Sequence, residues 1–121
     1  HAGKNIIDCH ALIDILEPET SDRYAIIERV GAMPGQGVSS VFRFGEGYGM
    51  LQASVAAQKT PVHFVTPAKW KKHFGLNRDK GVSRSKAMER FPNYAQLFSR
   101  VKDDGRAEAA LIALYGAENI N

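Results

Sequence analysis

The sequence predicts an α/β fold in which two strands are joined through a helix and followed by more helices. Two short apolar runs, residues 24–30 and 62–66, are rich in β-branched residues, as buried parallel strands are. A stretch with helical periodicity separates them, which gives a strand–helix–strand unit. The 121 residues are enough for one hydrophobic core, so we expect residues 1–121 to form a single domain.

The N-terminal part is predicted to contain a helix and then the first strand. Residues 8–16 (DCHALIDIL) carry apolar residues at helical spacing, and Pro18 ends this helix. Residues 24–30 form the strand, which we expect to be buried on both faces. Glu28 interrupts its apolar run.

A glycine-rich loop and a long helix follow. Residues 31–37 (GAMPGQG) contain three glycines and a proline, which is typical of a loop. Ser39 or Ser40 is expected to cap a helix that reaches about Gln58. Three glycines lie inside this helix: Gly45, Gly47 and Gly49. Each costs about 1 kcal/mol relative to alanine, so we expect another backbone, or a ligand, to approach closely there.

The second strand leads directly into a helix. Thr66 is a helix cap and Pro67 suits the first helical position, so the dipeptide predicts a helix start. Gly75 is expected to end this helix, and a charged loop over residues 76–81 follows.

Three helical segments complete the chain. Ser83 is predicted to cap a helix that ends before Pro92, and residues 94–99 form a short helical or irregular piece. The last helix covers about residues 105–114. Two parallel strands are few for a sheet that needs cover on both faces, so the element count predicts that strands are missing on the N-terminal side.

The basic residues are concentrated in one segment. The net charge is +3, from sixteen Lys and Arg against thirteen acids, and eight of the sixteen lie between Lys69 and Arg90. Asp79 and Glu89 are the acids in that segment. Such clustering predicts a surface for a polyanion, with a solvated lysine-rich surface as the alternative.

Composition restricts the other partners. Cys9 is the single cysteine, which excludes an internal disulfide, fits a reducing compartment and leads us to expect a cytoplasmic protein. No apolar run approaches the roughly 20 residues of a membrane span, so no membrane partner is expected. The loop over residues 31–37 lacks the Lys-Ser/Thr of a P-loop, and we expect no small-molecule organic cofactor.

Glu28 is the most informative single residue. A carboxylate near the end of a buried strand is costly unless it is paired, protonated or bound to a metal. Ligands of open α/β sheets bind at the carboxyl ends of strands, where Glu28 is expected to lie. The alternative is a salt bridge to Arg29 or to another arginine.

Asp104 and Glu108 are four residues apart and therefore share one face of the last helix. The alternative is that Asp103 or Asp104 caps this helix and that acids favour its first turn through the helix dipole. That alternative explains Glu108 less well, because a core pattern follows it. Together with Glu28, the acids suit Mg²⁺ or Mn²⁺, which activate water in phosphodiester cleavage.

Two further side chains have competing interpretations. Trp70 is expected to anchor its amphipathic helix in the core, and stacking on a base is the alternative. His73 follows two lysines, so it is either a phosphate contact or an ordinary surface residue.

Four segments carry a resemblance to a known family: IIERVGAMPGQGVSSVFRFGEGYGML, VHFVTPAKWKKHFGL, SRSKAMERFP and KDDGRAEAALIALYG. In this order they resemble the RuvC-like Holliday junction resolvases, in the phage and bacterial branch with E-x-V-x-A-M-P-G-Q-G-V-S-S and D-G-R-A-E-A signatures. The resemblance covers roughly residues 6–116. The set is specific, whereas any one of these motifs alone is not.

The resemblance implies a ribonuclease H-like fold, with a mixed sheet flanked by helices. It also implies a homodimeric endonuclease that cleaves branched DNA with Mg²⁺ or Mn²⁺. Glu28, Asp104 and Glu108 match the family's catalytic and metal-binding acids. The residues expected to contact DNA are Lys69, Lys71, Lys72, Arg84, Lys86, Met33, Gln36, Ser39 and Arg43.

The chain also departs from the family pattern. The family opens with a strand that carries an aspartate, followed by a hairpin, and this sequence has neither, so we expect the first three strands to be missing. Family members often have two aspartates three apart in the last helix, where this chain has Asp104 and Glu108. Gly31 stands where some relatives carry an aromatic wedge, and Met33 is expected to take that role.

Three functional interpretations remain from the sequence. The first is a metal-dependent endonuclease. The second is a non-catalytic DNA-binding relative with an incomplete metal site. The third is a structural or interaction domain in which the acids are helix caps and surface charges.

Overall fold

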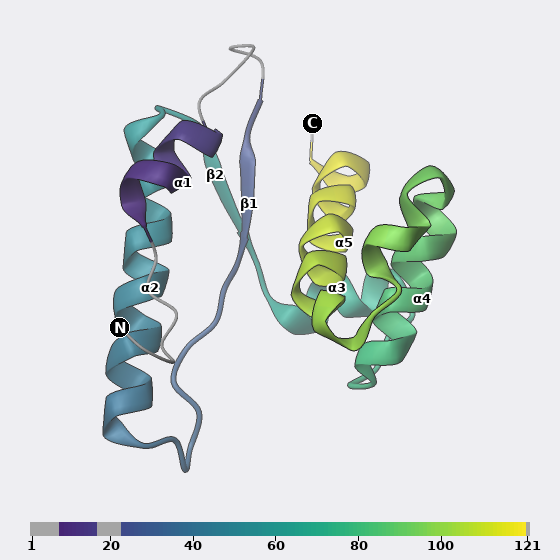
Figure 1. Ribbon diagram of the computed structural model, residues 1–121, viewed down its shortest axis with the longest axis horizontal. Coiled ribbons are helices and arrows are strands. Elements are labelled where there is room, and N and C mark those ends of the chain that lie inside the picture. Colours follow the sequence, from purple (N-terminus) through teal and green to yellow (C-terminus); the bar gives the residue numbers. More distant parts are fainter. Residues whose placement is uncertain (1–7, 17–22, 121) are drawn as a thin grey trace. The chain divides into compact units, whose positions relative to one another are not determined.

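The structure is a computed structural model that describes residues 8–16 and 23–120. Its elements follow in the order shown in Figure 1: α1 (Cys9–Leu16), β1 (Ala25–Glu28), α2 (Val38–Ala57), β2 (Val62–Val65), α3 (Pro67–His73), α4 (Lys80–Arg90), the 3₁₀ helices η1 (Pro92–Phe98) and η2 (Val101–Asp103), and α5 (Asp104–Asn119). The predicted α/β class and the predicted order of helices and strands are confirmed. Within the described ranges, no helix is long and apolar enough to cross a membrane.

The strands β1 and β2 pair in a two-stranded parallel sheet, with α2 as the connection between them. The backbone pairing continues past the strand ends, where Arg29 N donates to the Val65 carbonyl at 2.7 Å. The prediction that β1 is buried on both faces is wrong, since Ile27 is its one buried residue. A strand with a single neighbour in the described chain leaves much of its surface uncovered.

The chain gathers into two compact units, and each strand contributes to both. The first comprises His1–Ala25 and Val30–His63, as far as these ranges are described, and contains α1 and α2. These two helices pack against each other, and the Gln58 side-chain amide donates to the Ile13 carbonyl at 3.0 Å. The packing of α1 against α2 is therefore the main helix contact of the first unit.

The helix α2 differs from its prediction at two points. It begins at Val38 with Gly37 as its N-cap, so neither Ser39 nor Ser40 caps it. The expected close approach of another backbone is also not found, because a Cβ atom added at Gly45 or Gly49 would meet nothing within 4 Å among the described residues. These two glycines of α2 have no packing role in this structure.

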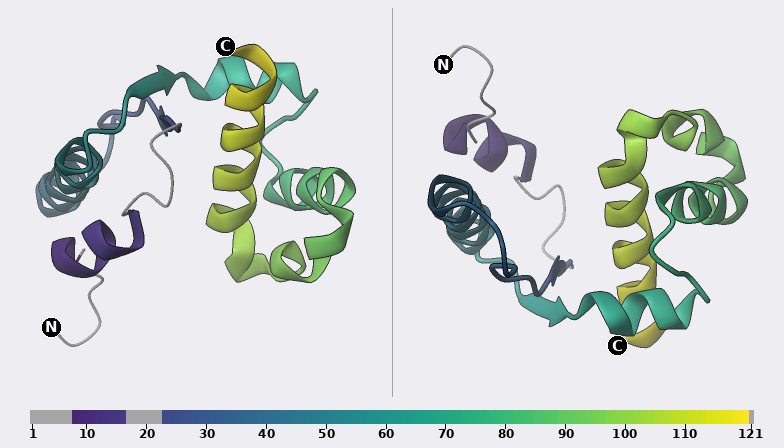
Figure 2. Two further views of the ribbon diagram at one scale, coloured as in Figure 1. Left: turned by 90° about the horizontal axis from the view of Figure 1, so that it is seen from above. Right: turned by 90° about the horizontal axis from the view of Figure 1, so that it is seen from below.

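The hydrophobic core lies in the second unit, which comprises Ile26–Arg29 and Phe64–Asn121. Its buried side chains come from β2, α3 and the residue after it, α4, η1 and α5. They are Val65, Trp70, Phe74, Ala87, Phe98, Ala107, Leu111, Ile112 and Tyr115. The helix α5 contributes four of these and packs against α3, α4 and η1 (Figure 2). It is the central helix of this unit.

The start of α3 is formed as predicted. Thr66 Oγ1 accepts a hydrogen bond from Lys69 N at 3.3 Å, and Pro67 occupies the first helical position. The helix ends before Gly75, which has a φ of +67° that a glycine adopts without strain. Interactions of residues next to each other in sequence therefore determine where α3 begins and where it ends.

The start of α4 lies earlier than predicted. Asp79 is the N-cap, and its Oδ1 accepts from Gly81 N at 2.8 Å. Ser83 does not cap the helix and instead lies buried inside it. Ser83 and Ala87 are one turn apart on the buried face of α4, and these small side chains let α4 pack closely against α5.

The start of α5 resembles the prediction but uses Asp103 differently. Asp103 is the N-cap residue, yet its side chain makes no capping bond to α5. Its buried carboxylate instead accepts from Arg100 N at 3.0 Å and pairs with the Arg100 guanidinium, which closes the turn of η2. The helix also continues past the predicted end, because Tyr115 packs in the core.

Enlarging Ala87 should destabilise the protein. We expect Ala87→Leu to lower the free energy of unfolding by about 1–3 kcal/mol, because the added atoms have no space on the fully buried face of α4. Urea denaturation measures the change. Ser85→Leu, at an exposed position of the same helix, should stay within about 0.5 kcal/mol of wild type. Equal effects at the two positions would contradict close α4–α5 packing.

Candidate functional site

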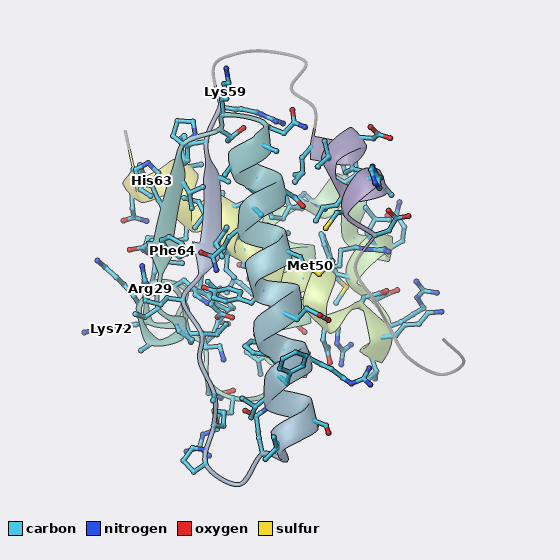
Figure 3. The ribbon with its side chains drawn as sticks, turned by 90° about the vertical axis from the view of Figure 1, so that its left-hand side faces the viewer. Arg29, Met50, Lys59, His63, Phe64 and Lys72 are labelled. Atoms are coloured by element: carbon cyan, nitrogen blue, oxygen red, sulfur yellow. The ribbon has the colours of Figure 1, made fainter. Side chains whose placement is uncertain are left out.

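Glu28 is the last residue of β1, and its carboxylate is bound by a tryptophan. Trp70 Nε1 donates to Glu28 Oε2 at 2.7 Å, and the Trp70 side chain is completely buried. The prediction that Trp70 anchors its helix in the core is confirmed. The neighbouring Arg29 places its guanidinium 4.2 Å from the centroid of the Phe64 ring, and Figure 3 shows the two side chains together. Glu28 is therefore oriented by a hydrogen bond from the core.

Asp104 and Glu108 lie one turn apart in α5, and each forms an ion pair with α4. Arg84 Nε lies 2.7 Å from Asp104 Oδ1, and Lys80 Nζ lies 2.7 Å from Glu108 Oε2. The order of the partners reverses along the two helices, as it does when helices pack antiparallel. We call these two ion pairs the charge ladder. Both pairs are only partly exposed, and an ion pair near the surface contributes about 1 kcal/mol or less, so their main effect is to neutralise the acids.

The charge ladder was not predicted from the sequence, which places Lys80 in a loop and Arg84 at a DNA surface. The available signal was the spacing, because Lys80 and Arg84 are four apart, as are Asp104 and Glu108. Matching four-residue spacings on two adjacent helices allow both pairs to form at once.

The three candidate acids do not gather into one metal-binding cluster. Within residues 8–16 and 23–120, no three His, Cys, Asp or Glu side chains form a group that could hold a metal ion. Carboxylate oxygens without thiolates still suit Mg²⁺ or Mn²⁺ by their chemistry. Asp104 and Glu108 are thus a pair of suitable donors on one face of α5, and Glu28 does not join them in one group.

The lysines of α3 remain candidates for DNA contact. Lys69 and Lys72 are exposed, and Lys71 is partly buried, with its Nζ 5.6 Å from the centroid of the Trp70 ring. No acid of α3 competes for these lysines, since the helix contains none. Their charges are therefore placed on one short helix.

The basic candidates of α4 have carboxylate partners. Arg84 pairs with Asp104 in the charge ladder, and its Nη1 also donates to the Ser99 carbonyl at 3.5 Å. Lys86 Nζ lies 3.3 Å from Glu89 Oε2 within the helix. Either residue would have to leave its partner to bind a phosphate.

The remaining DNA candidates belong to the first unit. Met33 and Gln36 lie in the loop before α2, where Gln36 Oε1 accepts from Met33 N at 2.7 Å and closes a turn. The Met33 side chain is 68% exposed, which suits an apolar wedge. Ser39 and Arg43 are exposed in the first turns of α2.

His73 contacts an acid in α5. Its Nε2 lies 2.9 Å from Glu118 Oε1, and Arg90 Nη2 lies 2.6 Å from Glu118 Oε2. The bond to His73, followed by the bond to Arg90, holds the pKa of the Glu118 carboxyl below its ordinary value. This cluster ties the ends of α3, α4 and α5 together.

Comparison with known proteins gives neither a matching family model nor a matching curated protein. Function is therefore inferred from the residues and their geometry.

Removing the charge of Glu118 should change how stability depends on pH. Because its pKa is lowered in the folded protein, Glu118 stabilises the fold above the ordinary glutamate pKa of 4.5, and this contribution is lost as the pH falls through the lowered pKa. We expect Glu118→Gln to lower the melting temperature at pH 7, with a difference from wild type that shrinks below pH 4.5. Thermal unfolding followed by circular dichroism measures both. A difference that is constant with pH would show that the ion cluster does not stabilise the fold.

Proposed function

We propose that this chain is a divalent-metal-dependent endonuclease domain with a ribonuclease H-like fold, acting on phosphodiester bonds of branched DNA as RuvC-like resolvases do. The observation that carries the proposal is the position of Glu28. It ends a parallel strand, three residues before the first residue of the GAMPGQG loop, and a buried N–H binds its carboxylate. The carboxyl ends of parallel strands are where α/β proteins place ligands.

Glu28, Asp104 and Glu108 are the residues that would hold Mg²⁺ or Mn²⁺. Such an ion polarises a phosphoryl oxygen and lowers the pKa of a bound water. The donor chemistry fits, whereas the present arrangement of the described residues does not bring the three acids into one group. We therefore assign the acids to metal binding and derive no catalytic step through the ion.

The charge ladder has a defined role in this proposal. Lys80 and Arg84 neutralise the acid pair of α5, and both side chains are long enough to turn toward a phosphate once the acids have another counter-ion. Arginine and lysine are the usual contacts of a phosphate backbone. Lys80 and Arg84 would thus neutralise the acids while no metal ion is bound and contact DNA once a metal ion has taken their place.

The lysines of α3 provide the sequence-independent part of DNA binding. Lys69, Lys71 and Lys72 lie on a helix without acids, and such residues bind the phosphate backbone whatever the base sequence. A homodimer would present two such sites, one for each strand to be cut at a branch. This requirement for two cuts is why we propose a dimer.

The second candidate function is a non-catalytic DNA-binding protein of the same family. The charge ladder favours it, because Asp104 and Glu108 already have cationic partners. Cleavage of a junction in the presence of Mg²⁺ or Mn²⁺ separates the two functions, since both predict binding.

Neutralising the candidate acids should stop cleavage without stopping binding. We expect Glu28→Gln and Asp104→Asn each to lower the rate of four-way junction cleavage by at least about 100-fold, beyond the range typical of residues that act through a metal ligand. Gel electrophoresis of end-labelled junctions measures cleavage, and a mobility shift measures binding. Asp14→Asn, an equivalent change at an exposed acid of α1, is the control and should cut normally. Wild-type binding without cleavage in either ion would support the non-catalytic function.

Removing lysines from α3 should reduce the salt dependence of binding. For Lys71→Ala combined with Lys72→Ala, we expect the slope of log affinity against log salt to fall by about 1 for each phosphate that the removed lysines neutralise. Fluorescence anisotropy at several salt concentrations measures the slope. Lys102→Ala, at an exposed lysine of η2, should leave the slope unchanged. An unaltered slope in the double variant would exclude α3 from the DNA surface.

A further inference from the structure

Arg29 is an exposed basic residue to which the proposed function assigns no role. It directly follows Glu28, the last residue of β1. Its guanidinium carbon lies over the Phe64 ring, 4.2 Å from the ring centroid, and this cation–π contact joins the two neighbouring strands (Figure 3). Both residues belong to the second unit. Arg29 is therefore held against an aromatic ring at the carboxyl end of the sheet.

The pairing of the strands turns Arg29 away from Glu28. Successive residues of a strand point to opposite faces of a sheet, and the backbone pairing extends to Arg29, whose N–H donates to the Val65 carbonyl at 2.7 Å. On one face, Glu28 accepts from Trp70, and Val65 is buried in the core. On the other face, Arg29 contacts Phe64, which is 37% exposed. The core therefore binds Glu28, whereas solvent reaches Arg29.

The charge of Arg29 is not used in an ion pair within residues 8–16 and 23–120. The ion pairs of these ranges use other basic side chains: His73, Lys80, Arg84, Lys86, Arg90 and Arg100. A cation over an aromatic ring keeps its full charge, because the ring attracts it through a quadrupole and supplies no counter-charge. Arg29 therefore presents a positive charge that an external anion can neutralise.

The contact with Phe64 leaves the hydrogen-bond donors of Arg29 available. A guanidinium is planar, and its N–H groups form a rigid fork that matches two oxygens of a phosphate. The ring contacts this group around its central carbon, so the N–H groups at its periphery remain free to bind an anion. The ring also restricts a flexible side chain, and ordering such a side chain on binding lowers affinity by roughly 2- to 10-fold. Arg29 is therefore ordered for a phosphate before any ligand binds.

We propose that Arg29 is a further DNA-binding residue, which contacts a backbone phosphate while Phe64 holds its guanidinium in place. The proposal rests on the DNA-binding part of the proposed function and involves no metal ion. The lysines of α3 support it, because α3 begins two residues after β2 ends and contains no acid. Lys72 of this helix projects on the same side of the ribbon as Arg29 in Figure 3. Arg29 adds a bidentate phosphate contact to the point charges of these lysines.

The main test is Arg29→Ala, a change at an exposed position. We expect weaker binding of a labelled four-way junction, with the slope of log affinity against log salt reduced by about 1, because one phosphate contact is lost. Fluorescence anisotropy at several salt concentrations measures affinity and slope. Arg106→Ala is the matched control, because it changes the net charge equally at an exposed arginine of α5. It should leave affinity and slope at their wild-type values.

Two variants of Phe64 test the role of the ring. Phe64→Leu removes the aromatic face and keeps the charge of Arg29, so the affinity should fall by about 2- to 10-fold while the salt slope stays at the wild-type value. Phe64→Tyr keeps an aromatic ring and should bind the junction normally. Circular dichroism checks that both variants are folded. Arg29→Lys keeps the charge but lacks the fork, so it should also lower the affinity without changing the slope.

The outcomes separate this inference from the proposed function. Wild-type affinity and slope in Arg29→Ala, or an equal loss in Arg106→Ala, would overturn the inference alone. Wild-type affinity in folded Phe64→Leu would overturn the role of the ring. A wild-type chain that binds the junction without cutting it would overturn the endonuclease function, and the binding of the Arg29 variants would still decide the inference. A wild-type chain that does not bind the junction would overturn both.

Discussion

The burial of Trp70 is the constraint on which the second unit depends. The indole is the largest fully buried side chain among the described residues, and it contacts the core shared by β2, α3 and α5. Its size requires helices to pack around it, and its single N–H requires an acceptor within reach. The fold meets the second requirement with Glu28 at the end of β1. Core packing and the placement of a candidate functional acid are thus consequences of one side chain.

The sequence left two interpretations open for the acids of α5, a structural role at the start of the helix and a role in metal binding, and the two are compatible. Asp104 lies in the first turn of α5, where the helix dipole favours a negative charge, and so it has an ordinary structural reason to be there. Glu108 lies a turn further along and is balanced by Lys80. Small residues such as Ser83 and Ala87 let α4 approach closely enough for both ion pairs. Asp104 and Glu108 therefore form ion pairs in this structure, and in the proposed function the same carboxylates would leave these partners to bind the metal ion.

What the sequence predicted correctly was mostly local. Thr66 and Pro67 determine where α3 begins through contacts that span only four residues, Thr66 to Lys69. The predicted start of this helix was confirmed. Asp79 and Ser83 are both good caps, and only burial of Ser83 in the tertiary structure decides between them. The Trp70–Glu28 bond joins residues 42 apart, and such a long-range pairing has no signature in local spacing. The candidate acids could be named from the sequence, but their partners could not.

The composition of the second unit has a consequence for the order of folding. Apart from the short segment Ile26–Arg29, this unit is one continuous stretch, Phe64–Asn121. Its helices pack with near neighbours in sequence, and topologies with such local contacts fold fast. The β1 segment closes a long loop, so it should dock after the helical core has formed. The carboxylate of Glu28 would reach its place last, on a core that is already assembled.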